Sequence, residues 1–281
     1  LILGDASPSG SATQLLVLEN HGAGQWSLSS STLSMNSAAS MSPAALAVGD
    51  VDGDGDLDVV IGMIGDGPVI FVNAGAGQFS HRPGTDVIPQ TAVVAPSRVE
   101  LADADADGDV DLLLSAGRAG LGSAPALQLF VNNGAGAFED VTAQRMPANH
   151  EGLDAMAVGD VDGDGALDVV TAVKGGVSRL YLNDGAGTFS EAAAGRLDLT
   201  GARALELADL DGDGDLDVIA AMPPQDVVRL NDGTGHFTAG PVVPQIAGGH
   251  HETLAVDVDN DGDVDLLGAG SSINLLLNTV T

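Results

Sequence analysis

The sequence predicts an all-β chain built from repeated four-stranded antiparallel units, and three observations lead to that prediction. An aspartate-rich string that first occurs at Asp50–Asp58 returns four more times. A second string, of the form Asn-x-Gly-x-Gly-x-aromatic, keeps step with it. Short runs rich in valine, leucine and isoleucine separate the two strings. A recurrence at this interval indicates one structural unit used several times.

The acidic string has the pattern D-x-D-x-D-G-x-x-D, and its successive copies begin 53, 57, 49 and 48 residues apart. The five copies are DVDGDGDLD, DADADGDVD, DVDGDGALD, DLDGDGDLD and DVDNDGDVD. The asparagine string begins at Asn20, Asn73, Asn132, Asn183 and Asn231, and a further asparagine, Asn278, stands where the next copy would begin.

The apolar runs between these strings are predicted to be strands, because they are short and are bounded by Gly, Asn, Asp or Pro. In the first complete unit, ALAVGD precedes the acidic string, LDVVIGM follows it, VIFVN leads into the asparagine string, and a fourth strand begins at Phe79. The glycines of the asparagine string suit a hairpin turn. Since strand direction alternates, the acidic loops and the asparagine turns should lie at the same end of each unit.

Four antiparallel strands in each of several repeats are typical of a β-propeller. A linear β-solenoid is the alternative, although its coils are usually much shorter. We expect a single domain over 1–281, or a fragment of a longer chain, with four whole units and two partial ones. The first unit lacks its inner strand and the last stops after its third, so we expect six or seven blades in the complete ring. The approximate units are 1–43, 44–96, 97–153, 154–202, 203–251 and 252–281.

Composition restricts the classes of partner. The chain of 281 residues carries 40 acids against 9 bases, for a net charge of −31. Nucleic acid is therefore not expected as a partner, because phosphate binding needs clustered Lys and Arg. The absence of cysteine excludes disulfides and thiolate metal sites. No apolar run reaches the length of a membrane span, and LILGDASPSG at the start does not read as a signal peptide.

The acidic string fits a calcium-binding loop between two strands. Carboxylates at positions 1, 3, 5 and 9 can converge if the glycine at position 6 allows a sharp turn, and Ca²⁺ prefers such hard oxygen ligands. Position 7 would offer its backbone carbonyl, because Ala166 occupies that position in one copy. An EF-hand is excluded, since position 12 is Ile61 rather than Glu and strands flank the loop. The alternatives are a solvated acidic turn without metal, and Mg²⁺.

We therefore expect about five Ca²⁺ sites and dependence of the fold on calcium. The predicted metal-binding residues are Asp50, Asp52, Asp54, Asp56 and Asp58; Asp103, Asp105, Asp107, Asp109 and Asp111; Asp160, Asp162, Asp164, Ala166 and Asp168; Asp209, Asp211, Asp213, Asp215 and Asp217; and Asp257, Asp259, Asp261, Asp263 and Asp265.

The two strings together resemble the FG-GAP/VCBS repeat family, which builds the propeller of integrin α-subunits and of many bacterial secreted proteins. The likeness lies in AVGDVDGDGDLDVVIG (47–62) with VNAGAGQF (72–79), and in AVGDVDGDGALDVVTA (157–172) with LYLNDGAGTF (180–189). The resemblance implies a propeller with Ca²⁺ in the acidic loops. The incomplete first and last units depart from the family pattern, whose propellers commonly have seven blades.

Ligand binding is expected at the strand ends opposite the acidic loops, where the connecting segments vary most. His250, His251 and Glu252 form the densest non-aspartate polar cluster, and His150 and Arg118 are further candidates. The alternative is an exposed polar loop without a ligand. We see no nucleophile motif, and we do not expect an enzyme.

The function that we expect is a calcium-stabilised, extracellular or cell-surface propeller that acts as a binding or adhesion module for a glycan or protein. A polysaccharide lyase or hydrolase on the same scaffold, or a structural segment of a larger surface protein, are the alternatives. Membrane insertion is not expected, and the incomplete terminal blades would allow self-association.

Overall fold

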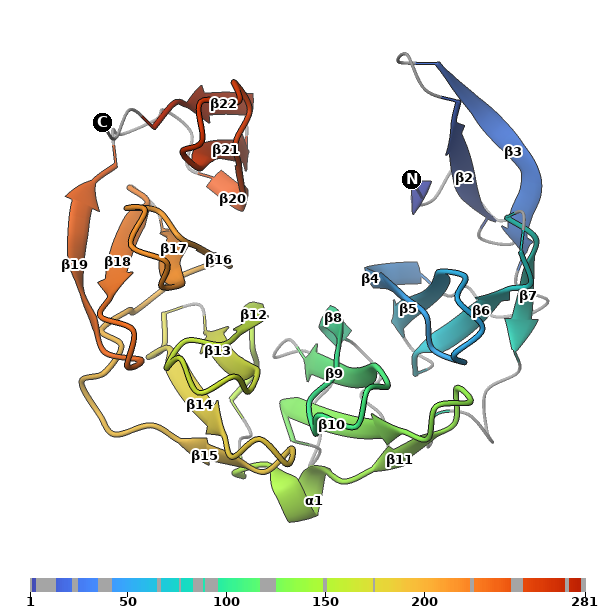
Figure 1. Ribbon diagram of the computed structural model, residues 1–281, viewed down its shortest axis with the longest axis horizontal. Helices are drawn as coiled ribbons and strands as arrows, with labels where there is room; N and C mark the ends of the chain where they lie inside the picture. The colour runs from blue at the N-terminus through green and yellow to red at the C-terminus, as the bar shows by residue number, and fades with distance from the viewer. Residues whose placement is uncertain are drawn as a thin grey trace. The chain divides into compact units, whose positions relative to one another are not determined.

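A computed structural model of the chain describes residues 2–3, 14–21, 25–34, 42–64, 67–75, 77–82, 88, 96–116, 125–148, 151–173, 175–222, 225–243, 250–270 and 273–278. Strands, turns and bends make up almost all of them, and the one helix among them, α1 (Thr142–Arg145), has four residues (Figure 1). No helix in the described part of the chain is long and apolar enough to cross a membrane. The all-β prediction is confirmed.

Four sheets have four antiparallel strands each, hydrogen-bonded in chain order, and they are the predicted blades of a β-propeller (Figure 1). The first contains β4 (Ser42–Gly49), β5 (Asp58–Ile64), β6 (Val69–Asn73) and β7 (Phe79–Arg82). The second contains β8 (Pro96–Ala102), β9 (Asp111–Ala116), β10 (Leu127–Asn132) and β11 (Phe138–Asp140). The third contains β12 (Ala155–Gly159), β13 (Asp168–Ala172), β14 (Arg179–Asn183) and β15 (Phe189–Glu191). The fourth contains β16 (Ala204–Ala208), β17 (Asp217–Ala221), β18 (Val227–Asn231) and β19 (Phe237–Val242).

Two sheets with three strands each begin and end the chain. The last contains β20 (His250–Val256), β21 (Asp265–Gly270) and β22 (Ile273–Leu276), with an acidic loop between β20 and β21. The first contains β1 (Ile2–Leu3), β2 (Gln14–Asn20) and β3 (Trp26–Ser34), and no acidic string occurs in this part of the sequence.

The prediction of six or seven blades is wrong, because five blades with an acidic loop are seen, the four complete sheets and β20–β22. The predicted count is too high because it includes β1–β3, a sheet that lacks the inner strand and the acidic loop of a complete blade. The two partial sheets otherwise have the strands that the sequence predicts.

The chain divides into two compact units, each described by itself. Unit 1 is 1–103 with 107–143, and unit 2 is 104–106 with 144–281. Within both, the second strand of each complete blade is buried along nearly its whole length, as in β9, where all six residues are buried. Since successive side chains of a strand point to opposite faces, both faces of these strands are covered. This explains why they read as continuous apolar runs.

The connection between the first and second strand of each blade is a loop that needs left-handed backbone at two positions. Position 6 is glycine in all five loops, with φ between 91° and 98°. Position 4 also has positive φ, and it is Ala106 (58°) in the second loop and Asn260 (60°) in the fifth. Glycine adopts this conformation at little cost, whereas a residue with a Cβ is strained there.

Candidate metal centres

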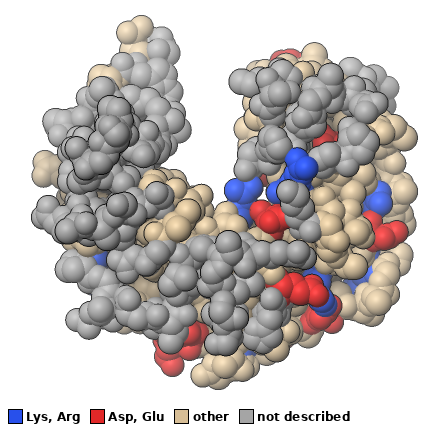
Figure 2. Space-filling model, turned by 180° about the vertical axis from the view of Figure 1, so that it is seen from behind, with Lys and Arg blue, Asp and Glu red and all other residues tan. Residues whose placement is uncertain are grey.

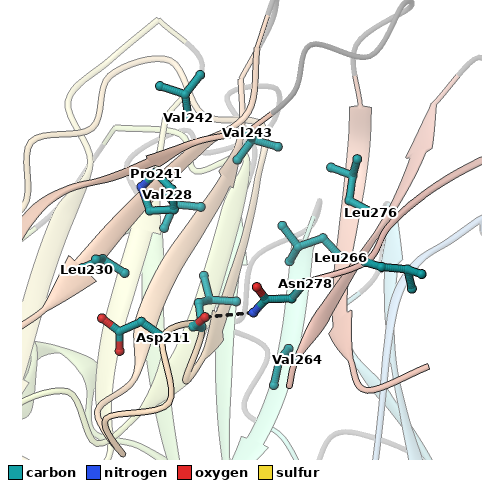
Figure 3. Close-up of a pocket in the computed structure, with 12 residues that line it drawn as sticks. Asp211, Val228, Leu230, Pro241, Val242, Val243, Val264, Leu266, Leu276 and Asn278 are labelled. Atoms are coloured by element: carbon teal, nitrogen blue, oxygen red, sulfur yellow. Dashed lines mark hydrogen bonds between the residues drawn. The ribbon is translucent and has the colours of Figure 1, made fainter. Parts of the chain in front are cut away.

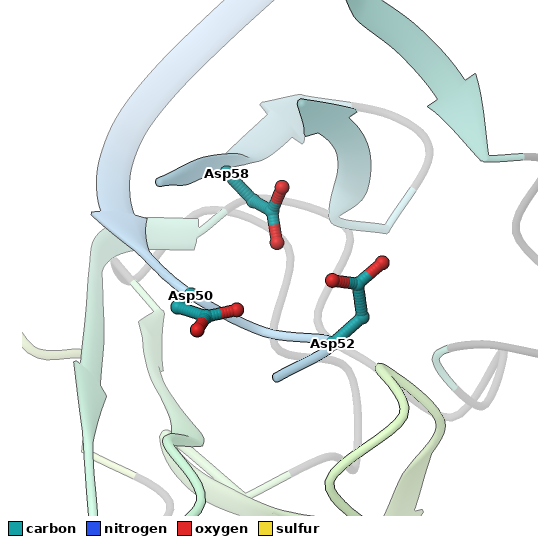
Figure 4. Close-up of side chains that lie close together, drawn as sticks. All are labelled: Asp50, Asp52 and Asp58. Atoms are coloured by element: carbon teal, nitrogen blue, oxygen red, sulfur yellow. The ribbon is translucent and has the colours of Figure 1, made fainter. Parts of the chain in front are cut away.

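Each acidic loop brings three carboxylates together at one point. In the first loop, one oxygen each of Asp50, Asp52 and Asp58 lies within 4.8 Å of the other two, and the side chains converge in Figure 4. These are positions 1, 3 and 9 of the string. The same three positions converge in the other loops, as Asp103, Asp105 and Asp111; Asp160, Asp162 and Asp168; Asp209, Asp211 and Asp217; and Asp257, Asp259 and Asp265.

Backbone N–H groups hold the position-1 and position-9 carboxylates in place. Asp50 accepts bonds from the N–H groups of Gly53 (2.8 Å) and Gly55 (2.9 Å). Asp58 is fully buried and accepts one bond from Val51 N in the loop (2.9 Å) and one from Asn73 N at the end of β6 (2.7 Å). The position-9 carboxylate therefore connects the start of the loop to the third strand of its own blade by hydrogen bonds.

The remaining predicted positions are not members of these clusters. At position 5, the Asp54 carboxylate accepts a bond from the N–H of residue 56 (2.9 Å), and its counterparts in the other loops do the same. At position 7, Asp56 and Asp109 lie against Gly75 and Gly134 of the asparagine turn of their own blade. Position 7 thus lies outside the clusters, consistent with the alanine found there in one loop.

Burial and mutual repulsion disfavour the ionised form of the position-9 carboxylates. Burial raises the pKa of Asp58 and Asp217 above its ordinary value, and it raises the pKa of Asp168 to about 6, although two backbone N–H bonds to each carboxylate act in the opposite direction. Neighbouring aspartates of the same loop add to the increase. A cation at the centre of such a cluster would favour the ionised form and relieve the repulsion.

One oxygen of the position-3 carboxylate provides the test of whether a metal fits. Oδ1 of Asp52, Asp105 and Asp162 is buried and has no hydrogen-bond partner. A buried carboxylate oxygen without a partner is costly, and a metal ligand is one state in which it is satisfied. Together with the convergence of three carboxylates, this donor set fits a hard divalent cation such as Ca²⁺.

The asparagine that begins the second string has a role beyond the hairpin turn. Asn132 Nδ2 donates to the carbonyl of Val110 in its own loop (3.0 Å) and to that of Val51 in the preceding blade's loop (2.8 Å). Within unit 2, corresponding bonds join Asn183 to Ala104, Asn231 to Val161 and Asn278 to Leu210. Each of these asparagines therefore links consecutive acidic loops, and the prediction that loops and turns share one end of a blade is confirmed.

Arginine side chains, which sequence reasoning did not single out, lie beside three of the position-3 aspartates. Arg145 donates to Asp105 Oδ2 (2.9 Å) and to Ala186 O in the next asparagine turn (3.2 Å). Arg196 donates to Thr234 O (2.8 Å), and its charge acts to lower the pKa of Asp162. In unit 1, Asp52 and Arg82 line one pocket. The available signal was an arginine that recurs within seven residues of the aromatic residue that begins the fourth strand, at Arg82, Arg145 and Arg196.

The candidate ligand-binding residues are only partly covered by the structure. Arg118 and His150 lie outside the described residues. His250, His251 and Glu252 begin β20, at the opposite end of that strand from its acidic loop, as predicted, and only their backbone is described. Basic side chains on the described part of the face in Figure 2 lie among acidic ones rather than in one patch.

Comparisons with known proteins agree with this geometry. A profile described as FG-GAP-like repeat matches residues 6–61, 50–114, 115–171, 160–220 and 209–268. No curated protein matches the sequence. Among solved structures, an Agrocybe aegerita lectin is similar to this chain, with 20% sequence identity and a TM-score of 0.62. The match covers 100% of this chain and 80% of the lectin, whose structure was solved to study specific recognition of non-reducing terminal N-acetylglucosamine. A structure of BBS1N in complex with ARL6DN is 14% identical, with a TM-score of 0.56 over 95% and 76%. At these identities the likeness shows the fold.

Proposed function

The chain belongs to the FG-GAP-like repeat family, and from this premise we propose that it is a calcium-stabilised extracellular β-propeller that binds a glycan or protein ligand and is not an enzyme. The observation that carries the calcium part is the convergence of three aspartates in each of five loops. The buried, unpartnered Oδ1 atoms at position 3 support it further. Weak oxygen-ligand sites fill at the millimolar calcium levels found outside cells, which supports the extracellular location.

Calcium binding is tested by titration calorimetry on the chelator-treated protein. We expect about five Ca²⁺ to bind and Mg²⁺ to bind more weakly. Asp52→Asn should remove one site, because Asp52 is part of the first cluster. The matched control is Asp56→Asn, which makes the same change of charge in the same loop, at a side chain that lies against Gly75 instead. An equal loss of Ca²⁺ in both variants would mean that general acidity, not the cluster, attracts the ion.

Chelation should also lower the melting temperature, because an ion that binds only the folded state adds to its stability. A site filled at a hundred times its Kd contributes about 2.7 kcal/mol. The comparison is made by circular dichroism at matched ionic strength, with and without chelator. An unchanged melting temperature would contradict the proposal.

We place the proposed binding role at the strand ends opposite the acidic loops. His250 to Glu252 lie at such an end, separated from the acidic loop by the length of β20. The lectin and BBS1N structures, which have the same fold, were solved in work on glycan recognition and on a protein complex respectively. They support a binding role for this chain without indicating which ligand it takes.

A glycan array probed in calcium, with a parallel array in chelator, tests this role. We expect binding that requires calcium and that is reduced when His250 and His251 are both replaced by alanine. His236→Ala is the control, since His236 lies in the asparagine turn at the other end of a blade. If the double variant binds as well as the parent, the site is elsewhere. If no glycan binds, a protein ligand becomes the candidate, to be sought with the same variants.

A further inference from the structure

Three arginines, Arg82, Arg145 and Arg196, lie between an acidic loop and the asparagine turn of the next repeat. Arg145, in unit 2, has the most direct contacts: its Nη1 donates to Oδ2 of Asp105, at position 3 of the loop (2.9 Å), and to Ala186 O in the turn (3.2 Å). The Asp105 side chain is only 13% exposed. One oxygen of this carboxylate is therefore held by the arginine, whereas Oδ1 is buried without a protein partner.

The second glycine of the asparagine turn leaves room for the guanidinium. A Cβ at this glycine would come close both to the arginine and to the position-3 aspartate. Its distance to Nη1 of the arginine would be 2.6 Å at Gly136 beside Arg82, 2.7 Å at Gly187 beside Arg145 and 3.3 Å at Gly235 beside Arg196. Its distance to the aspartate Cβ would be 3.5, 2.9 and 3.5 Å respectively. Turn, arginine and aspartate thus meet in the same arrangement once in unit 1 and twice in unit 2.

Arg196 repeats the contacts of Arg145 at the next turn along the chain. Its Nη1 donates to Thr234 O (2.8 Å), and its backbone carbonyl accepts from Phe237 N (2.7 Å). Burial raises the pKa of Asp162, and the charge of Arg196 acts in the opposite direction. Asp162 Oδ1 is also buried without a protein partner. The arginine therefore acts on the same position-3 carboxylate that converges with the other aspartates of its loop.

The fourth loop shows that the arginine is an addition to the acidic loop. Its string, DLDGDGDLD, differs from that of the first loop at one position, but residues 238–249 contain no Arg or Lys. Figure 3 shows Asp211, at position 3 of this loop, and apolar side chains such as Val243 from that segment. The bond from Asn278 to Leu210 O (3.1 Å) is nevertheless present. The asparagine bond between repeats thus forms without an arginine, so the arginine has a separate role.

We propose, on the basis of the calcium binding proposed above, that Arg82, Arg145 and Arg196 are positioning residues for the sites in the first three loops. Each holds the position-3 carboxylate so that Oδ1 stays available to the ion, and each joins that carboxylate to the turn of the next repeat. Calcium binding in these loops therefore also stabilises the contact between repeats. Groups that orient metal ligands typically contribute about tenfold to a hundredfold to metal affinity, and we expect this to outweigh the repulsion between guanidinium and ion.

The test compares Arg196→Met with Arg229→Met. Both changes remove one guanidinium from unit 2, and both arginines donate to a backbone carbonyl of the adjacent repeat, Arg196 to Thr234 O and Arg229 to Asp198 O (2.9 Å). Of the two, Arg196 is the one that lies beside a position-3 aspartate. Calorimetric titration with Ca²⁺ should show one site weakened about tenfold or more in Arg196→Met, and binding like that of the parent in Arg229→Met.

The increase in melting temperature that calcium produces separates positioning from a purely structural role. This increase should be smaller in Arg196→Met than in the parent, and unchanged in Arg229→Met. A purely structural role would lower the melting temperature of Arg196→Met equally in calcium and in chelator, and would overturn the inference. If circular dichroism shows that Arg196→Met does not fold, Arg82→Met provides the same measurements in unit 1.

Combining Arg196→Met with Asp162→Asn tests whether the arginine acts through this aspartate. Asp162→Asn alone should remove one site, and adding Arg196→Met should weaken no other site. A further weakened site in the double variant would overturn the inference. If the parent binds calcium and Arg196→Met binds it equally or more tightly, the inference is wrong and the proposed calcium binding stands. If the parent binds no calcium, both are wrong.

Discussion

Replacing Asn132 by alanine should destabilise unit 1 more than the same change at Asn73, because of these two residues Asn132 is the one whose side chain bonds to two acidic loops. Asn132 is 3% exposed. Its side chain makes four bonds: Nδ2 donates to Val51 O (2.8 Å) and Val110 O (3.0 Å), and Oδ1 accepts from the N–H groups of Asn133 (2.8 Å) and Gly136 (3.1 Å). At about 1 kcal/mol net for each buried bond, the expected loss is about 4 kcal/mol.

Asn73 is the matched control, because it holds the same position in the preceding blade. Its side chain donates to Leu57 O (3.2 Å) in its own loop and accepts from Gly75 N (3.1 Å), and it is only half-buried. The expected loss for Asn73→Ala is about 1 to 2 kcal/mol. Both residues belong to unit 1, so the two losses are compared within one compact unit.

The assay is urea denaturation of both variants in excess calcium, followed by circular dichroism. The transition midpoint should fall clearly further for Asn132→Ala, with the slope of each transition unchanged. Equal losses in the two variants would refute the reasoning, because they would show that the bond to Val51 contributes nothing beyond the local turn.

Three further predictions concern the loops and strands. Ala106→Gly should stabilise the protein by about 0.5 kcal/mol, because Ala106 has a φ of 58° and glycine adopts this conformation without Cβ strain; thermal unfolding in calcium measures the change, and a loss of stability would show that the alanine is not strained. Glu100→Gln should stabilise the protein at neutral pH. Burial raises the pKa of Glu100, so its contribution to the stability of the parent is present at low pH and is lost as pH rises through that raised value. Glutamine does not ionise and avoids this loss. Urea midpoints between pH 4 and pH 8 should converge toward low pH, and a constant difference would contradict this. Gly62→Ala should cost about 1 to 3 kcal/mol, since the new Cβ would lie 2.6 Å from Pro96 Cγ and 2.9 Å from Val99 Cγ2; an unchanged melting temperature would show that β8 moves aside freely.

The strands and the acidic loops could be predicted from the sequence because their determinants are local. Apolar runs bounded by turn residues predicted β5 and β9, and the spacing of aspartates predicted the convergence of Asp50, Asp52 and Asp58. The same spacing predicts position 5 as a ligand, and this stays a prediction. One oxygen of the Asp54 carboxylate accepts a bond from the backbone N–H of residue 56, a local contact that the spacing of aspartates does not reveal.

The contacts between blades could not be predicted in the same way. Asn132 reads as a turn residue until the loop that contains Val51 is placed next to it, 81 residues away in the chain. Arg145 and Asp105 are likewise 40 residues apart. The blade count failed for a related reason, because strand composition alone does not distinguish the sheet β1–β3 from a repeat with its loop.

The fully buried aspartate at position 9 connects neighbouring candidate metal sites through hydrogen bonds. Asp58 receives an N–H from Val51, and the carbonyl of the same Val51 receives the amide of Asn132, whose own N–H reaches Asp111. A series of hydrogen bonds thus connects the first cluster to the second. A second series of the same kind connects Asp168 through Val161 and Asn231 to Asp217. Calcium binding in one loop should hold the carboxylates of the connected loop in place. We therefore expect the two connected loops to bind calcium cooperatively, with a saturation curve steeper than that of independent sites.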